Sequence, residues 1–363
     1  MPDNDRRLFR QLCYACTPLY ASVFSESPSK PVKPNKPIYS FGYFLPHALR
    51  WLVTASLLVV FGLAVYIGIR FYHIDNQVAR WWLSATSSAP APVPHANSLP
   101  LHNYQMDVGA RVVAGVDRNL SGLAFNSDRQ QLIAVINRPA TLLTMDLEGR
   151  VLSRHRLHNA SDIEGVAYLG NNRIAMTEEG RSRIIVTDLP AIGFFNSDMD
   201  LRHADSIELD LGVQGAFDAE NRNAGFEGLG YDQQNDHLYV AKEHSPRALY
   251  RISGIGQQIE TGRMAVRVED LGNWLSSARM GTDLSSVDVM SNGHLLLLSD
   301  ESQSIVELNK SGEIANLVEI RDIKGNNTTV PQPEGLALGP DGTLYMISEP
   351  NLFYRLSPHD KPV

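Results

Sequence analysis

From about Asn103 to the C-terminus, short apolar runs alternate with polar turns, and no long stretch shows helical periodicity. Five segments follow one plan of apolar strand, polar turn and second strand. They run over Asn119–Asn137, Asp162–Glu178, Gly225–Glu243, Asp283–Asp300 and Gln332–Glu349. A third strand pattern follows each segment, and a fourth follows each of the first four. Repeated units of four short strands are typical of a β-propeller.

The two ends of the repeat region complement each other. The fifth repeat ends after its third strand, and the apolar run Tyr104–Val113 stands unused in front of the first repeat. This run can supply the missing outer strand and so remove an exposed sheet edge. We therefore predict an all-β, five-bladed β-propeller over residues 103–358. A sixth blade is the alternative, because the long intervals between repeats carry insertions, notably at 191–204 and 212–223.

The N-terminal third has a different pattern. Residues Trp51–Ile69 carry no charge and lie between Arg50 and Arg70. At 1.5 Å per residue they span roughly 28 Å, enough for a bilayer core, so we predict a single transmembrane helix within 49–72. Residues 1–48, rich in Pro, Ser and Lys, read as a disordered tail, and 73–102 as a Pro/Ala/Ser-rich linker. The role of Cys13 and Cys16, the only cysteines, stays open because a lone pair separated by two residues is a weak motif.

Charge distribution predicts how the chain is oriented. Seven basic residues precede the apolar segment and only Arg70 and Arg80 follow closely, so the tail is expected in the cytoplasm. In a bacterium the repeat domain then lies in the periplasm, anchored to the inner membrane. Residues 1–102 hold nine basic and four acidic residues, whereas the remainder holds 23 basic and 36 acidic. An acidic domain disfavours nucleic acid and suits cations.

The repeats predict an acidic cluster at one end of the propeller. In each blade the start of the innermost strand and the end of the second strand emerge on the same face. Seven of these ten positions are carboxylates, which are the candidate metal ligands: Glu164, Glu227, Glu334, Glu178, Glu243, Asp300 and Glu349. Asp162 and Asp283 are candidates at the rim. An all-oxygen set without Cys or regular His favours Ca²⁺. The alternative is structural: each Glu-Gly pair opens an innermost strand, with its carboxylate bonded to backbone N–H groups.

The stretches "DIEGVAY", "FEGLGYD", "LYVAKE" and "PEGLAL" resemble the SdiA-regulated, YjiK-like family of membrane-anchored bacterial β-propellers. The resemblance covers roughly residues 103–358. It implies a periplasmic propeller and calcium binding at Glu164, Glu227, Glu334 and their strand partners, since the family is likened to phytase-type propellers. The chain departs from that likeness at Ser121 and Ser285, which stand where a Glu is expected, and it shows no basic cluster for a polyphosphorylated substrate.

Three functions are consistent with these observations. The first is a periplasmic binding or signalling module that holds a divalent cation, with a protein or glycan as a further partner. The second is a calcium-dependent, phytase-like phosphoesterase, for which no catalytic residue is assigned. The third is a metal-free interaction scaffold. Sequence motifs of serine hydrolases, zinc proteases, P-loop proteins and dinucleotide-binding proteins are absent.

Overall fold

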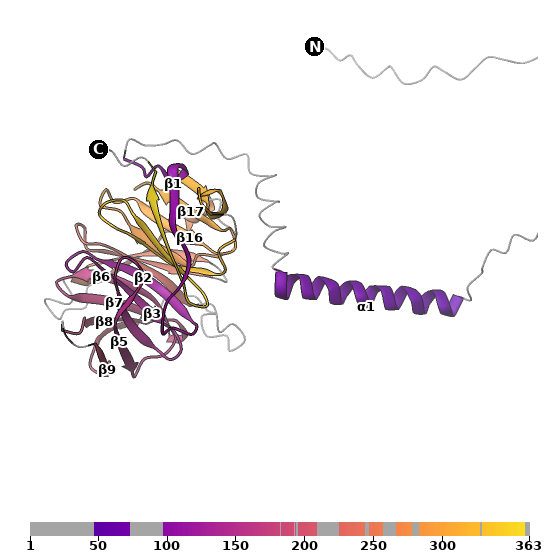
Figure 1. Ribbon diagram of the computed structural model, residues 1–363, viewed down its shortest axis with the longest axis horizontal. Coiled ribbons are helices and arrows are strands. Elements are labelled where there is room, and N and C mark those ends of the chain that lie inside the picture. The colour runs from indigo at the N-terminus through magenta and orange to yellow at the C-terminus, as the bar shows by residue number, and fades with distance from the viewer. Residues whose placement is uncertain are drawn as a thin grey trace, which may run out of the picture. The chain divides into compact units, whose positions relative to one another are not determined.

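The computed structural model describes residues 47–72, 97–181, 183–191, 193, 195–208, 225–243, 247–256, 266–277, 283–326 and 329–359. These residues form one long helix and a β-propeller (Figure 1). The predicted tail up to residue 46, with Cys13 and Cys16, and the linker residues 73–96 lie outside the described residues. The predictions for those segments therefore stay predictions.

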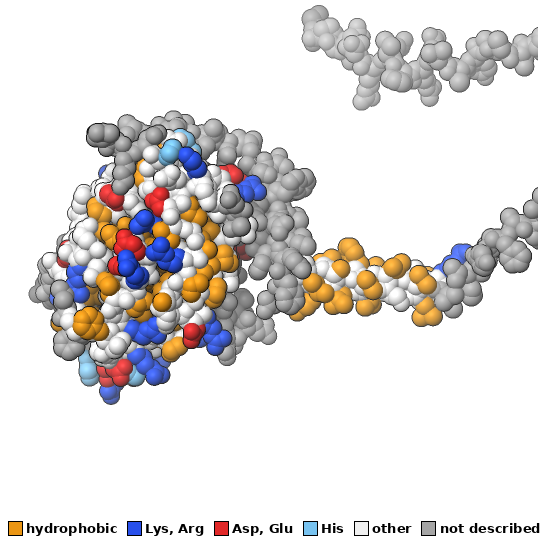
Figure 2. Space-filling view, in the orientation of Figure 1, with side chains coloured by type: hydrophobic (Ala, Val, Ile, Leu, Met, Phe, Trp, Pro, Cys, Tyr) orange, Lys and Arg blue, Asp and Glu red, His pale blue; other side chains and the backbone are white. Residues whose placement is uncertain are grey.

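Helix α1 (His47–Tyr72) contains the predicted membrane segment. Within it, Arg50–Gly68 is long and apolar enough to cross a membrane. Its apolar side chains are exposed, with Trp51 at 74% and Val59 at 70%. Hydrophobic side chains run along its whole visible length in Figure 2. A helix whose described side chains are apolar and exposed on all sides is typical of a segment whose solvent is lipid.

Twenty of the strands form five antiparallel sheets, which are the five blades of the propeller. In order from the innermost strand outward, the blades are β2 (Leu120–Asn126), β3 (Gln131–Ile136), β4 (Thr141–Met145) and β5 (Val151–His158); β6 (Ile163–Gly170), β7 (Arg173–Glu178), β8 (Arg183–Asp188) and β10 (Asp205–Glu208); β11 (Phe226–Asp232), β12 (His237–Lys242), β13 (Ala248–Ser253) and β14 (Arg267–Asp270); β15 (Ser286–Val289), β16 (Leu295–Ser299), β17 (Ser304–Leu308) and β18 (Ile314–Glu319); β19 (Pro333–Leu338), β20 (Leu344–Ser348), β21 (Leu352–Pro358) and β1 (Tyr104–Val112). Short helices η1 (Leu101–Asn103), η2 (Glu179–Arg181), α4 (Gly272–Ser277) and η3 (Ile320–Asp322) lie between strands.

The innermost strands close into a ring. Strands β2, β6, β11, β15 and β19 contact one another in that order, and β19 contacts β2. Five hydrophobic clusters fill the spaces between adjacent blades, one at each interface. The core is therefore divided among blade interfaces, and every blade depends on two neighbours for the burial of its apolar side chains.

Strand β1 closes the ring as the sequence predicts. It pairs antiparallel with β21, with Tyr104 opposite Pro358 and Val112 opposite Leu352. Figure 1 shows the purple strand β1 beside the yellow C-terminal strands. Tyr104 is 1% exposed and donates a hydrogen bond to the carbonyl of Gly342 at 2.6 Å. The first and the last strands of the propeller thus belong to one blade.

The insertion at 191–204 does not form a sixth blade. Its strand β9 (Asn196–Asp200) pairs in parallel with β5 and adds a fifth strand to the first blade. The chain then returns to the second blade as β10, which pairs with β8. The other insertion, at 212–223, lies outside the described residues.

The glycines of the Ser-Gly and Glu-Gly pairs allow the innermost strands to approach closely. A Cβ on Gly165 would lie 2.2 Å from the carbonyl oxygen of Glu227, and one on Gly122 would lie 2.5 Å from that of Glu164. The fourth blade has Ser286 at this position, and its hydroxyl accepts a hydrogen bond from the N–H of Leu336 at 3.2 Å. At Gly122 and Gly165, glycine is therefore required by backbone contact between blades, whatever the role of the preceding residue.

Candidate metal centre

The predicted carboxylates lie at one end of the ring, where the innermost strands begin and the second strands end. We call this end the acidic mouth. In the second blade Ile163 pairs with Glu178, and in the third Phe226 pairs with Lys242. Antiparallel pairing therefore places Glu164 and Glu227 near the residues that follow β7 and β12. This arrangement follows from the repeat pattern, because each first and second strand form a hairpin.

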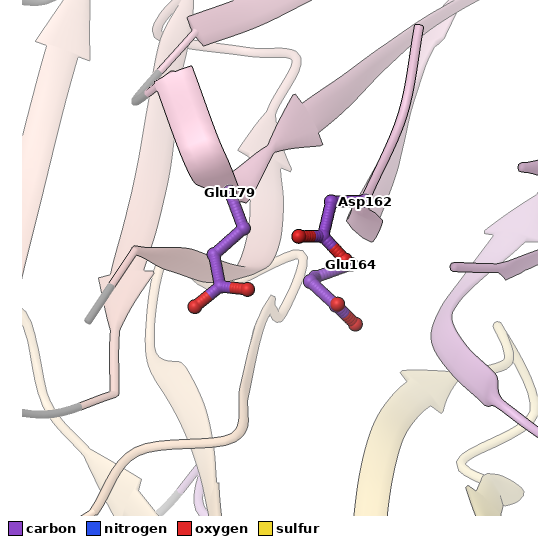
Figure 3. Close-up of side chains that lie close together, drawn as sticks. All are labelled: Asp162, Glu164 and Glu179. Carbon is purple, nitrogen blue, oxygen red and sulfur yellow. The ribbon is translucent and has the colours of Figure 1, made fainter. Parts of the chain in front are cut away.

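Three carboxylates of the second blade converge at this mouth. Asp162, Glu164 and Glu179 each offer an oxygen, and the three oxygens lie within 4.8 Å of one another. Figure 3 shows the carboxylate of Asp162 directed toward Glu179, with Glu164 beside it. Glu164 is 8% exposed and Glu179 is 7% exposed. Oxygens at such separations can share one cation, because Ca²⁺ ligands lie about 2.3–2.6 Å from the ion.

The first blade fixes the orientation of Glu164. Ser121 donates its hydroxyl to Oε2 at 2.7 Å, and Asn137 donates its side-chain N–H to Oε1 at 2.9 Å. Ser121 and Asn137 are the two positions of the first blade where the repeat lacks a carboxylate. They act as hydrogen-bond donors to the carboxylate of the next blade. The Oδ1 atom of Asn137 is buried and has no hydrogen-bond partner among the described residues.

Burial and repulsion from neighbouring carboxylates raise the pKa values of Glu227 and Glu179 at the acidic mouth. Burial raises the pKa of Glu227 well above its ordinary value, and the charges of Glu164, Glu243, Glu179 and Glu334 add to the shift. The pKa of Glu179 is raised to about 7, again chiefly by burial. Such groups hold protons unless a cation stabilises their charged form.

Burial and repulsion between carboxylates also raise pKa values in the fourth and fifth blades. Burial raises the pKa of Glu334 well above its ordinary value, and Glu243, Asp300, Glu164 and Glu349 raise it further. Burial also raises the pKa of Asp300 to about 7 and that of Glu349 above its usual range. Glu334, Glu243, Asp300 and Glu349 are all partly buried. Six of the seven predicted carboxylates therefore belong to one electrostatic cluster.

Glu178, the seventh predicted carboxylate, forms an ion pair with Arg183. It is 1% exposed, and its Oε2 atom lies 2.7 Å from Nη2 of Arg183. Its Oε1 atom accepts a hydrogen bond from the N–H of Ser161 at 2.9 Å. The neighbouring Glu179, which was not among the predicted residues, faces Glu164 instead. The doublet Glu178-Glu179 is the only signal in the sequence that could have indicated it.

Asp283, the other candidate at the rim, is hydrogen-bonded to residues of its own blade. It is fully buried and accepts hydrogen bonds from the N–H groups of Asp300 at 2.7 Å and Glu301 at 3.1 Å. The hydroxyl of Ser299 donates to it at 2.5 Å. These bonds hold the turn after β16, as in the structural alternative weighed above. Asp283 and Glu178 are thus bound by partners within the blades, whereas Asp162, Glu164 and Glu179 form the group that could hold an ion.

Basic side chains offset part of this charge. Arg138 donates two hydrogen bonds to Asp162, at 2.9 and 2.7 Å. Lys242 is 4% exposed; burial lowers its pKa, while the charges of Glu179, Glu227 and Glu243 oppose that shift. Lys242 was also missed by sequence reasoning. The donor set still fits a hard cation, because it consists of oxygens and because the pKa values of Glu164 and Glu179 stay raised beside these bases.

A closed five-bladed ring with a buried acidic mouth defines this protein as a β-propeller with a candidate cation site. Residues 96–357 match the model of the SdiA-regulated family, and the chain belongs to that family. Similar solved structures include a streptogramin B lyase, 13% identical over 72% of this chain and 99% of the other, with a TM-score of 0.40. Virginiamycin B lyase from Staphylococcus aureus is 13% identical over 68% of each chain, with a TM-score of 0.36. A luciferin-regenerating enzyme is 11% identical over 69% of this chain and 95% of the other, with a TM-score of 0.41. Similarity at this level gives no information on the activity of this chain.

Proposed function

We propose that this protein is a membrane-anchored periplasmic propeller that binds a divalent cation, Ca²⁺, at its acidic mouth and serves as a binding or signalling module. The observation that carries the proposal is the convergence of Asp162, Glu164 and Glu179 within 4.8 Å. Burying carboxylates without compensation is costly, and a divalent ion supplies two positive charges at one point.

The donor chemistry supports Ca²⁺ over other ions. Zn²⁺ prefers Cys and His, neither of which belongs to the triad, and Mg²⁺ keeps most of its waters in strict octahedral geometry. Ca²⁺ accepts six to eight oxygens in flexible arrangements. Glu227 and the partly buried carboxylates of the other blades can complete such a set directly or through water. Glu164 is already oriented for this role by Ser121 and Asn137.

The proposed location rests on α1 and on the distribution of basic residues. An uncharged helix of bilayer length favours an anchor, and the excess of Lys and Arg before it favours a cytoplasmic N-terminus. A reporter enzyme fused after the last residue tests this orientation. Activity from a reporter that works only in the cytoplasm would contradict the proposed location.

Calorimetric titration of the full chain in detergent micelles, after treatment with a chelator, tests cation binding. We expect Ca²⁺ to bind with a dissociation constant of roughly 10⁻⁶ to 10⁻³ M, and more tightly than Mg²⁺. Glu164→Gln and Glu179→Gln should each weaken binding at least about tenfold, since each removes one charged ligand. The absence of both heat and a thermal shift on adding Ca²⁺ would refute the proposal.

The matched control is Asp188→Asn in the same blade. Asp188 lies at the opposite end of β8, is 72% exposed and pairs with Arg173 at 3.3 Å. It should bind Ca²⁺ as the wild type does. If the calcium-loaded chain releases phosphate from a generic phosphomonoester, the phosphoesterase function is supported instead of the binding module.

A further inference from the structure

A second cavity lies at the other end of the propeller, where the innermost strands end. It encloses about 400 Å³, within the usual range for small-ligand pockets. Its lining includes the ends of all five innermost strands, from Phe125 on β2 to Leu338 on β19. We call it the second mouth. It shares no lining residue with the acidic triad, so it is a separate site.

One position in the second mouth departs from the pattern of the other blades. Two residues after each close-approach position, four blades carry Ala or Gly and the fourth blade carries an aspartate; the residues are Ala124, Ala167, Gly230, Asp288 and Ala337. Small side chains at these places keep the cavity open. Asp288 is a single carboxylate among them and keeps part of its surface accessible.

Asp288 has backbone hydrogen bonds but no cationic partner in the cavity lining. Its Oδ2 atom accepts the N–H of Leu338 at 2.7 Å, and its Oδ1 atom accepts that of Val289 at 2.8 Å. Each carboxylate oxygen can accept a further hydrogen bond. Burial raises the pKa of Asp288 to about 6, which still leaves it mostly ionised at neutral pH.

The charges of the second mouth have one sign. Among the described residues, Asp232 is the other charged residue in the lining, and none of the lining residues described is Lys, Arg or His. Asp232 already holds its own turn, because its Oδ1 atom accepts the N–H groups of Gln234 at 3.0 Å and Asn235 at 3.2 Å. The cavity is therefore negative, and Asp288 is the carboxylate able to take an outside partner.

Aromatic side chains line the same cavity as Asp288. Phe125, Tyr168 and Tyr231 occupy equivalent positions on β2, β6 and β11, line the cavity and are partly exposed. The hydroxyl of Tyr231 donates a hydrogen bond to Oδ1 of Asp236 at 2.9 Å, so the polar end of this side chain already has a partner. Aromatic faces attract organic cations through the ring quadrupole.

We propose that the second mouth binds a small organic cation, with an alkylammonium head against Asp288 and an apolar body among Phe125, Tyr168 and Tyr231. A bare metal ion does not fit, since one available carboxylate cannot supply the six to eight oxygens that Ca²⁺ requires. An anion does not fit, because the described lining residues include two carboxylates and no base. The site is independent of the calcium site proposed above.

The first test compares two probes of equal shape on the full chain in maltoside micelles. Choline carries a quaternary ammonium group, and 3,3-dimethylbutan-1-ol replaces its nitrogen with carbon. Binding is followed by ligand-observed NMR and calorimetry. We expect choline to bind at least about tenfold more tightly than the alcohol, a ratio within reach of one carboxylate and a desolvated aromatic face. Equal affinity, or no binding of choline, would overturn the proposal.

Variants then locate the site. Asp288→Asn should abolish the preference for choline, and Phe125→Leu, which removes no hydrogen bond, should weaken choline about threefold or more. If Asp288→Asn does not fold, Phe125→Leu and the probe ratio decide. Glu179→Gln is the control at the acidic mouth and should bind choline as the wild type does. Loss of choline binding in Glu179→Gln, or its retention in folded Asp288→Asn, would overturn the assignment.

Discussion

Replacing Gly165 with alanine should separate the second and third blades. The new Cβ would lie 2.2 Å from the carbonyl oxygen of Glu227 and 2.9 Å from Oγ1 of Thr177. Ordinary contact begins at 3.4 Å, so the two innermost strands would have to move apart by about 1 Å. The N–H of Gly165 donates to Thr177 at 2.6 Å, and this buried bond would weaken as well.

Overpacking and the weakened hydrogen bond together determine the expected loss of stability. Overpacking costs about 1–3 kcal/mol, and a buried hydrogen bond contributes about 0.5–1.5 kcal/mol, so we expect a loss of roughly 2–4 kcal/mol in the free energy of unfolding. For a domain of this size each kcal/mol lowers the melting temperature by about 2–4 °C. Calcium affinity should fall too, because the moved strands carry Glu164 and Glu227.

Thermal and denaturant unfolding of the full chain in detergent measure the loss. The matched control is Gly180→Ala in the same blade, where a Cβ would meet nothing within 4 Å. That variant should be neutral or slightly stabilising, since alanine reduces the freedom of the unfolded chain. A Gly165→Ala protein as stable as Gly180→Ala would refute the close-approach explanation of the Glu-Gly pairs.

Three further predictions concern pH, an ion pair and ring closure. Without a bound cation, the pKa values of Glu179 and Asp300, both raised to about 7, favour folding at low pH. The free energy of unfolding should therefore fall as the pH rises from 5 to 8, and added Ca²⁺ should restore it. A free energy of unfolding that rises with pH would contradict these pKa shifts. Glu178→Gln should lower the free energy of unfolding in denaturant by about 3–5 kcal/mol, because it leaves the largely buried Arg183 without its ion-pair partner. The Ca²⁺ affinity of the folded variant should equal that of the wild type. A loss of affinity would show that Glu178 belongs to the metal site. Deleting Tyr104–Val112 should expose the edge of β21 and give aggregates in size-exclusion chromatography, and a monodisperse, stable product would contradict closure by β1.

The repeat pattern was sufficient to predict the fold. Alternation of short apolar runs and turns gave the hairpins, and the surplus run at the front gave β1 as the closing strand, which the structure confirms. The pairing of β9 with the first blade was not predictable. Its sequence, Asn196–Asp200, is polar and exposed at alternate positions, and only contact with β5 makes it a strand.

The acidic mouth was predictable in outline and less so in detail. The repeats placed the carboxylates on one face because hairpin geometry is local. The choice between Glu178 and Glu179 depends on where β7 ends and η2 begins, and the sequence does not specify that boundary to one residue. The basic partners Arg138 and Lys242 depend on contacts across the hairpins and between elements, which no repeat pattern contains.

Closure by β1 has a consequence for how the protein is made. Strand β1 is the first strand of the propeller to be synthesised, and its partner β21 is the last. The ring can therefore close only after β21 has been made, and β1 has no neighbouring strand in its blade until then. Removing β21 alone would leave β1 without that neighbour and expose the edge of β20, so the fifth blade would lose two of its four strands.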